Sequence, residues 1–250
     1  MKIAVITGAS SGLGAKFASE IRGVFPEIEQ LWLIARRADR LAAAAETLKT
    51  PCRLISADLT GDGVSELESL LGREKPDVAL LINCAGCGYL GNVKEQDEAL
   101  ILRCVDLNVR ALTQVTRAVL PYMGRGGHII NVSSIASFCP NPRMTVYSAS
   151  KSYVTDFSLG LGDELRPCGI SVTSVCPGPM ATEFLDIGNI SGNSKMFRSL
   201  PFCDAGKVAG GALAAAKRGR TTYTPTAFFR LYRFVAKVVP HGLLVKWVRT

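Results

Sequence analysis

Short runs rich in valine, isoleucine and leucine alternate along this chain with stretches of helical composition, and this alternation limits the folds open to it. The apolar runs cover residues 2–7, 31–35, 52–56, 78–83, 127–132 and 170–176, and the helix-like stretches lie near 13–24, 38–49, 62–72, 96–123 and 146–167. Continuous apolar strands separated by helices are typical of a parallel sheet connected by right-handed crossovers. The sequence therefore predicts one α/β domain, a doubly wound parallel sheet with helices on both faces.

The composition agrees with a globular protein whose thiols are reduced. With 250 residues, of which 48% are hydrophobic and 20% charged, the chain suits one domain with a substantial core. The N-terminal apolar run is too short for a signal peptide, and no apolar run approaches about 18 residues, so a cytoplasmic protein is expected. Cys84 and Cys87 form a CxxC pair, but a zinc site needs a second ligand pair, and His128 and His241 are distant in sequence. No metal site is predicted.

The first predicted strand runs into a glycine-rich turn, Thr7-Gly8-Ala9-Ser10-Ser11-Gly12-Leu13-Gly14, and then a helix. Glycines permit a tight turn and close backbone approach, and the helix N-terminus offers free amides and a positive dipole to a pyrophosphate. A plain turn is the alternative interpretation of this segment alone. Its place at the first strand-to-helix turn favours dinucleotide binding by Gly8, Ser10, Ser11, Gly12, Leu13 and Gly14.

The second predicted strand ends in Arg36-Arg37, with no acidic residue before Asp39. In a dinucleotide-binding fold this position meets the ribose 2′ group, where a carboxylate suits a hydroxyl and an arginine suits a phosphate. A guanidinium can bind a phosphate through two hydrogen bonds. NADP(H) is therefore predicted rather than NAD(H), although the two arginines could also be a solvated start of the next helix.

Tyr147 and Lys151 lie four residues apart in the predicted helix 146–167. Residues at i and i+4 share one face of a helix, so the ammonium lies beside the phenol. Free tyrosine titrates near pH ~10, and a nearby cation is expected to lower this pKa toward the range where proton transfer to or from a substrate oxygen is efficient. Such pairs are common on amphipathic helices, so the interpretation depends on the neighbouring motifs.

With the glycine-rich turn and the Tyr147/Lys151 pair in one chain, the sequence resembles the short-chain dehydrogenase/reductase family in its single-domain, Rossmann-type form. The resemblance covers roughly residues 1–185. The further matching positions, in the family's order, are Asp58 with Leu59, the Asn83-Cys84-Ala85-Gly86 motif in which Cys84 replaces a second asparagine, Asn108, Ser134, Pro177-Gly178 and Thr182.

The resemblance implies a mechanism and a set of site residues. It makes Tyr147 the general acid in ketone reduction and the general base in alcohol oxidation, with Ser134 hydrogen-bonded to the same substrate oxygen. Lys151 is expected to lower the tyrosine pKa and to bind the nicotinamide ribose, and Asn108 to support a proton-relaying water. The implied cofactor-binding residues beyond the glycine turn and the arginines are Asp58, Leu59, Asn83, Ala85, Gly86, Tyr147, Lys151, Pro177, Gly178 and Thr182. The family also implies a homodimer or homotetramer.

The segment at about 183–202 contains apolar residues around a Ser/Gly/Asn patch, as expected of a substrate loop that orders over a hydrophobic molecule. It can equally be a loop that packs on the core. The predicted function is interconversion of a secondary alcohol and a ketone on a hydroxysteroid-like or lipid substrate. Two alternatives are reduction of a 3-oxoacyl thioester on an acyl carrier protein or coenzyme A, and dinucleotide sensing without catalysis.

The chain's basic charge is concentrated in its C-terminal part. Residues 207–250 hold nine Lys/Arg and no Asp/Glu, whereas residues 1–206 hold twenty against twenty-one. Residues 221–226 are the expected last strand, so residues 1–225 are predicted to form the domain and residues 226–250 a basic amphipathic extension. Within the extension a first helix is expected to end before Pro240. On that helix Phe228, Leu231, Tyr232, Val235 and Val239 share one face, and Arg230, Arg233 and Lys237 the opposite one. Such an extension can contact an anionic membrane, pack on its own domain or meet a subunit. No nucleic-acid motif accompanies the charge.

Overall fold

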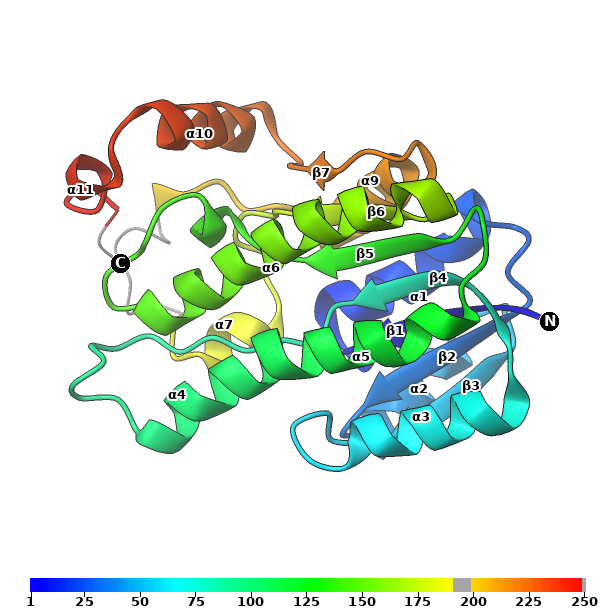
Figure 1. Cartoon of the computed structure of the whole chain (residues 1–250). Coiled ribbons are helices and arrows are strands. Elements are labelled where there is room, and N and C mark those ends of the chain that lie inside the picture. Colours follow the sequence, from blue (N-terminus) through cyan, green and yellow to red (C-terminus); the bar gives the residue numbers. More distant parts are fainter. Residues whose placement is uncertain (191–198, 249–250) are drawn as a thin grey trace.

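Seven parallel strands form one sheet in the order β3-β2-β1-β4-β5-β6-β7 in a computed structural model that describes residues 1–190 and 199–248 (Figure 1). The strands are β1 (Lys2–Thr7), β2 (Gln30–Ala35), β3 (Cys52–Ser56), β4 (Asp77–Asn83), β5 (His128–Val132), β6 (Ser171–Val175) and β7 (Thr222–Tyr223). The predicted apolar runs thus match the strands, and the predicted doubly wound sheet is confirmed.

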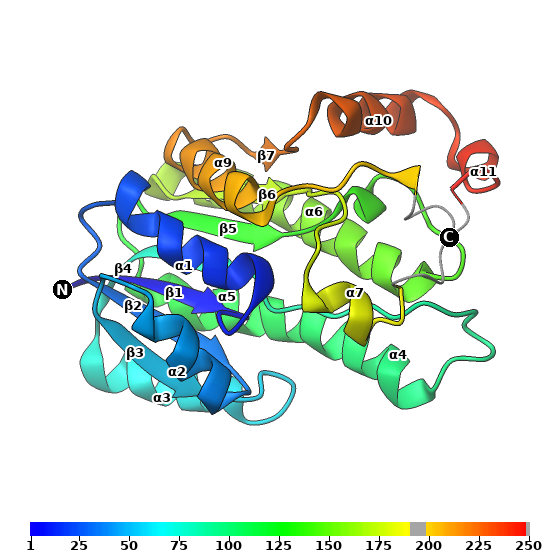
Figure 2. The same cartoon turned by 180° about the vertical axis from the view of Figure 1, so that it is seen from behind.

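Helices cover both faces of the sheet. One face carries α1 (Gly12–Val24), α2 (Ala38–Glu46) and α9 (Ala205–Lys217), seen in front in Figure 2. The other carries α3 (Gly63–Glu74), α5 (Leu112–Val119) and α6 (Thr145–Leu165), seen in front in Figure 1. Successive strand residues point to opposite faces, so Leu31 and Leu33 join the core under α1 and α9 while Trp32 joins the core under α3 and α5. Both faces of the strands are therefore apolar, as the continuous runs indicated.

The position of the site follows from the strand order. β1 lies between β2 and β4, so the chain moves outward in one direction up to β3 and then continues on the other side of β1. At such a switch point the connections after neighbouring strands turn to opposite faces and leave a crevice at their carboxyl ends. The glycine-rich turn after β1 and the Asn83–Gly86 motif after β4 meet at this crevice.

The predicted helix at 96–123 is observed with a change of pitch in its middle. It consists of α4 (Glu98–Val105), a π-helical segment η1 (Asp106–Ala111), α5 and a short 3-10 turn η2 (Leu120–Tyr122). Single π-helical turns inside α-helices occur frequently at functional sites. Here the segment contains Asn108, which was predicted to belong to the active site.

Several elements were not predicted. They are α9, the short helix α7 (Glu183–Ile187) and the 3-10 turns η3 (Ile135–Ser137) and η4 (Arg166–Cys168). α9 packs along α1 and buries Val208, Ala209 and Leu213 against it. Its alanine- and glycine-rich sequence lacks the strong charge alternation of a surface helix, since so much of it is buried.

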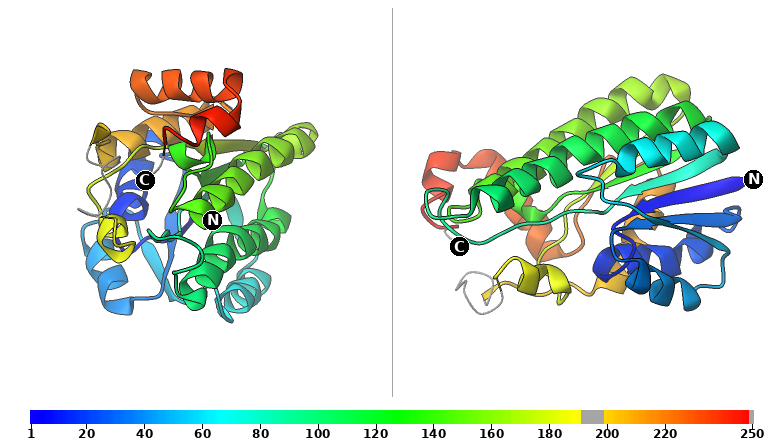
Figure 3. Two further views of the ribbon diagram at one scale, coloured as in Figure 1. Left: turned by 90° about the vertical axis from the view of Figure 1, so that its left-hand side faces the viewer. Right: turned by 90° about the horizontal axis from the view of Figure 1, so that it is seen from below.

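The C-terminal extension forms α10 (Ala227–Val238) and α11 (His241–Leu244), interrupted at Pro240 as predicted. These helices lie beyond β7 at the end of the molecule to which the carboxyl ends of the strands point (Figures 1 and 3). α10 contacts the domain through Phe229 and Ala236, whose side chains are buried, with Tyr232 partly buried beside them. The docking face overlaps the apolar face predicted from the sequence only in part: Tyr232, Val235 and Val239 are partly buried, whereas Phe228 and Leu231 remain 53% and 62% exposed.

Candidate active site

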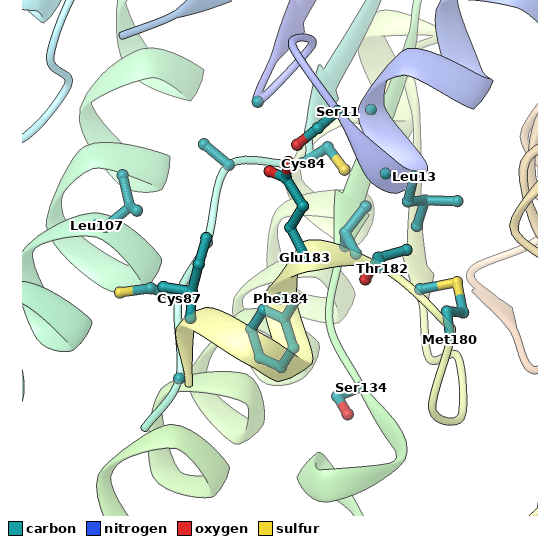
Figure 4. A pocket seen from close by; sticks show the side chains of 18 of the residues that line it. Ser11, Leu13, Cys84, Cys87, Leu107, Ser134, Met180, Thr182, Glu183 and Phe184 are labelled. Carbon is teal, nitrogen blue, oxygen red and sulfur yellow. The ribbon is translucent and has the colours of Figure 1, made fainter. Parts of the chain in front are cut away.

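A cavity of about 260 Å³ opens at the carboxyl ends of the strands (Figure 4). It is bounded by the glycine-rich turn, the β2–α2 turn, the segment after β4, the start of α6 and the segment from β6 into α7. The predicted site residues that line it are Gly8, Ser10, Ser11, Gly12, Leu13, Gly14, Arg36, Arg37, Asp58, Leu59, Ala85, Gly86, Ser134, Tyr147, Lys151, Pro177, Gly178 and Thr182. Asn83 and Asn108 lie behind this lining.

The glycine-rich turn packs against its neighbours so closely that Gly8 and Gly14 leave no room for a side chain. Gly8 has φ +69°, and a Cβ there would lie 2.8 Å from the amide nitrogen of Ala85. A Cβ on Gly14 would lie 2.1 Å from the carbonyl oxygen of Gly8. The Thr7 hydroxyl accepts hydrogen bonds of 3.1 Å from the amides of Cys84 and Ala85, which joins the turn to the end of β4. The turn thus brings the open N-terminus of α1 to the cavity, as binding of a pyrophosphate requires.

Three arginines gather at the outer rim of this cavity. Arg37 donates to the Ser11 hydroxyl at 3.5 Å and to the carboxylate of Glu183 at 2.8 Å, and Arg40 also pairs with Glu183. The side chains of Arg36 and Arg37 are 54% and 40% exposed. These guanidiniums could hold an anionic group beside the glycine-rich turn.

Glu183 and Arg40 were missed by sequence reasoning. Figure 4 shows Glu183 reaching from α7 toward the glycine-rich turn. The ion pair with Arg37 joins residues that are 146 positions apart, so no local pattern signals it. It connects the start of the predicted substrate loop to the rim of the cofactor end of the cavity.

Next to Arg36 on the same rim, Asp58 is held by several groups. Its carboxylate accepts from the amide and hydroxyl of Thr60 at 3.0 and 2.8 Å, and it lies 3.4 Å from Arg103 and 4.0 Å from Arg36. Burial alone would raise the pKa of Asp58, but the Thr60 hydrogen bonds and the two arginines outweigh it and leave the pKa below its usual value. An ionised Asp58 therefore marks the rim at the end of β3.

Tyr147, Lys151 and Ser134 meet at the inner end of the cavity. Tyr147 and Lys151 lie in the first two turns of α6, and Ser134 is the second residue after β5. The Ser134 hydroxyl lies close enough to the Tyr147 phenol to lower its pKa. The Lys151 ammonium donates to the Val132 carbonyl at 2.8 Å and lies 5.7 Å from the centroid of the Tyr147 ring. The i, i+4 arrangement expected from the sequence is thus present.

The predicted lowering of the tyrosine pKa is not what the structure shows. Burial raises the pKa of Tyr147 above its ordinary value, and the nearby Ser134 hydroxyl opposes this only in part. Burial likewise lowers the pKa of Lys151. Desolvation disfavours the charged form of both groups and is the largest influence on each pKa. At neutral pH the phenol is therefore protonated and has a proton to donate to a substrate oxygen.

Asn108 positions the backbone beside these groups. Its side-chain oxygen accepts from the Cys87 amide at 2.9 Å, and its nitrogen donates to the Cys87 carbonyl at 2.8 Å and to the Ser150 hydroxyl at 2.9 Å. A Cβ on Gly86 would lie 3.1 Å from the Asn108 oxygen and 3.3 Å from the Lys151 nitrogen. The side chain of Asn108 thus ties the segment after β4 to α6, through Ser150 next to Lys151.

Asn83 lies behind the cavity lining. Its side chain is buried and donates to the Thr116 hydroxyl and to the Asn131 side-chain oxygen, both at 2.9 Å. Because successive strand residues point to opposite faces, the last residue of β4 faces α5 rather than the cavity. Asn83 therefore supports the pairing of β4 with β5, and its side chain is not part of the cavity lining.

The wall around the phenol is apolar. Tyr147 belongs to a cluster with Met144, Leu185 and Ile190, and its ring centroid lies 5.5 Å from that of Phe184. Phe184, Leu185, Met180 and Leu200 also line the cavity. The first part of the predicted substrate loop thus forms α7 over the site, whereas the prediction for residues 191–198 lies outside the described residues.

This geometry defines a dinucleotide-binding fold. Its buried tyrosine, serine and lysine form a group suited to oxidation–reduction chemistry. The family model described as short chain dehydrogenase matches residues 2–188. The chain belongs to this family, and it is an oxidoreductase. The family and the fold predicted from the sequence are therefore confirmed.

Two solved structures and one curated relative illustrate the similarity. A short-chain dehydrogenase from Sphingobium yanoikuyae in complex with NADPH is 29% identical with a TM-score of 0.81, covering 98% of this chain and 95% of that one. The bulky-bulky ketone specific alcohol dehydrogenase from Comamonas testosteroni is 31% identical with a TM-score of 0.74, covering 98% and 94%. The very-long-chain 3-oxoacyl-CoA reductase of Rattus norvegicus is 32% identical over 197 residues, which are 74% of this chain and 61% of that protein.

Proposed function

We propose that this protein is an NADP(H)-dependent oxidoreductase that interconverts a secondary alcohol and a ketone on a hydrophobic substrate. The observation that carries the proposal is the buried Tyr147–Ser134 pair, with Lys151 beneath it, facing a cavity whose nearby wall is apolar. A carbonyl oxygen can meet these two hydroxyls while its carbon substituents contact Phe184 and Leu185. The site thus fits one polar oxygen on an otherwise apolar molecule.

The chain's own residues account for the proton chemistry. Ser134 orients the substrate oxygen and stabilises the charge that develops on it. Tyr147 donates its proton to this oxygen during reduction and takes it back during oxidation. A nicotinamide bound here would supply or accept the hydride. Lys151 would hold the ribose of that cofactor, and Asn108 keeps the segment after β4 in place.

The preference for NADP(H) is supported by the arginines at the rim. Arg36 and Arg37 follow β2, where the ribose 2′ position falls in this fold, and their side chains are exposed enough to receive an anion. The similar Sphingobium yanoikuyae enzyme was crystallised with NADPH. A 2′-phosphate that displaced Glu183 from Arg37 could accept charge-assisted hydrogen bonds from both Arg36 and Arg37.

Cofactor titration tests this preference. We expect NADPH to bind at least tenfold more tightly than NADH, equivalent to about 1.4 kcal/mol. The double variant Arg36→Ala/Arg37→Ala should lose this difference, and Arg22→Ala, an exposed arginine of α1, should keep it. Equal binding of both dinucleotides by the wild type would refute the assignment of the arginines.

A Tyr147→Phe variant tests the chemical step separately. We expect kcat with an apolar ketone to fall by about 10²–10⁴, because a positioned general acid contributes that much. NADPH binding should stay within about twofold of the wild-type value. Unchanged turnover would remove Tyr147 from the mechanism, whatever the cofactor preference.

Reduction of a 3-oxoacyl thioester is the second candidate, and the similarity to the Rattus norvegicus 3-oxoacyl-CoA reductase favours it. The same hydroxyl pair would serve a 3-keto group. Comparing kcat/KM for 3-oxoacyl-CoA with that for bulky apolar ketones decides between the two. A ratio of at least tenfold in favour of the thioester would replace the first proposal.

A further inference from the structure

The C-terminal helices carry a group of exposed apolar side chains. On α10 these are Phe228, Leu231, Phe234 and Val238, with exposed fractions of 53%, 62%, 64% and 66%. On α11 and the turn after it they are Leu243 and Trp247, the latter 86% exposed. These six residues are called the apolar row below. Large contiguous apolar patches on a protein surface mark interaction sites.

The docking of α10 makes this row face away from the domain. Phe229 and Ala236 are buried, and at about 100° per residue Leu231 and Val238 lie on the opposite side of the same helix. The inner side of α10 thus packs on the domain, and the apolar row is not needed for that packing. A surface helix that leaves large apolar side chains exposed is a candidate for contact with an external partner.

Basic side chains flank the row without carboxylate partners. Arg230, Lys237 and Lys246 are exposed, and within residues 1–190 and 199–248 none of them lies within 4.0 Å of an acidic group. The chain has no Asp or Glu after Asp204. A second copy placed on this face by a two-fold axis would bring like charges together, which disfavours self-association. The charge instead complements an anionic surface.

We propose that α10 and α11 dock the protein onto the surface of an anionic lipid bilayer. The apolar row enters the boundary between headgroups and acyl chains, while Arg230, Lys237 and Lys246 contact the lipid phosphates. Tryptophan is the residue type most suited to this boundary, since its ring is apolar and its N–H remains able to hydrogen-bond. In the described residues no helix is long and apolar enough to cross a bilayer, so the contact is a peripheral one.

The site opens at the end of the molecule where these helices lie. Figures 1 and 3 show α10 and α11 at the end to which the strands' carboxyl ends point, and α7, which covers the cavity, lies at the same end. Ile187 of α7 is 58% exposed there. Docking by the apolar row therefore holds the cavity end of the protein near the bilayer.

The two tryptophans make the proposal directly measurable. Trp32 is 0% exposed in the sheet, whereas Trp247 is 86% exposed in the row, so a change of emission on adding vesicles reports Trp247. We expect a blue shift with vesicles of phosphatidylcholine containing about 30% phosphatidylserine, and little with phosphatidylcholine alone. The shift should be lost in Trp247→Phe and reversed by 0.5 M salt, since exposed charges are screened at that ionic strength.

Paired surface variants test the apolar and the charged parts. Two double variants should each lower co-sedimentation with the anionic vesicles by at least tenfold: Arg230→Glu/Lys237→Glu and Leu231→Ser/Phe234→Ser. For the charged pair this follows because each basic residue near the surface changes the binding constant about fivefold. Leu102→Ser, at a 53% exposed leucine on α4, is the matched control and should bind as wild type. Equal thermal midpoints and equal NADPH binding show that each variant is folded.

Three outcomes would overturn the proposal. Absence of binding to the anionic vesicles removes it. Equal binding to both vesicle types, unaffected by Arg230→Glu/Lys237→Glu, removes the role of anionic lipid. A concentration-dependent dimer that Leu231→Ser/Phe234→Ser dissociates, measured by sedimentation without lipid, assigns the row to a second copy of the chain instead.

Discussion

Phe229 is the residue whose removal best tests how the C-terminal extension is attached. Its side chain is 0% exposed, and a Cβ on Gly178 would lie 2.1 Å from its Cε2 atom. The ring therefore packs closely against a glycine of the segment that lines the cavity. We expect Phe229→Ala to lower the free energy of unfolding and to loosen this segment.

The magnitude follows from the burial. Replacing a fully buried phenylalanine by alanine costs about 3–5 kcal/mol, because the transfer term and the vacated cavity add. The neighbouring Phe228 is 53% exposed, so Phe228→Ala removes roughly half of a transfer term of 1.5–3 kcal/mol and leaves no cavity. The expected difference between these adjacent substitutions is about 2–4 kcal/mol.

Urea unfolding followed by far-ultraviolet circular dichroism measures both losses by linear extrapolation. NADPH affinity should fall in Phe229→Ala and remain unchanged in Phe228→Ala. Similar small losses in both variants would show that α10 is not anchored by Phe229.

A double-mutant cycle adds a second criterion. Gly178→Ala should destabilise the wild type because the new methyl group displaces the ring, and it should cost less when Phe229 is already alanine. A coupling free energy in the range of about 0.5–3 kcal/mol is expected for residues in contact. Additive losses would contradict the packing described above.

Three further predictions concern the site and its support. Gly14→Ala should abolish NADPH binding, because its Cβ would meet the Gly8 carbonyl oxygen. At Gly23 in the same helix a Cβ would have no neighbouring atom within 4 Å, so Gly23→Ala should raise the free energy of unfolding in urea by about 0.4–1 kcal/mol. Burial lowers the pKa of His128 below its ordinary value of 6.5, so near that pH the unfolded chain binds a proton that the folded protein does not. The free energy of unfolding should therefore fall as the pH drops below 6.5, by at most about 1.4 kcal/mol per pH unit. A urea midpoint that falls as steeply between pH 6.5 and 5.5 in His128→Gln would contradict this. Ser134→Ala should reduce kcat by about 10²–10³ without changing NADPH affinity, and an equal loss of affinity would indicate a structural role instead.

Local features allowed much of the fold to be predicted. The apolar runs identified the strands because a strand covered on both faces is apolar throughout, and such a run is visible without knowing its neighbours. The glycine-rich turn and the four-residue spacing of Tyr147 and Lys151 are equally local. α9 escaped prediction because a buried helix of small residues shows little amphipathic pattern.

The site was predictable only as far as its motifs extend. Ser134, Thr182 and the glycines line the cavity as expected. Glu183 could not be assigned to the rim, since its partner Arg37 lies 146 positions away. The motif identified Asn83 but not the strand face to which its side chain points, which is the face covered by α5.

The sequence by itself determined the parallel α/β architecture, the family and the residues able to carry proton transfer, because helical spacing, strand composition and turn chemistry are properties of short segments. Only the tertiary structure decided the pKa of Tyr147, which depends on how much of the phenol is removed from water and not on Lys151 alone. It also decided which side of α10 is buried. The helix has more apolar surface than the domain can cover, and the position of Gly178 selects Phe229 for the interior while the apolar row stays outside.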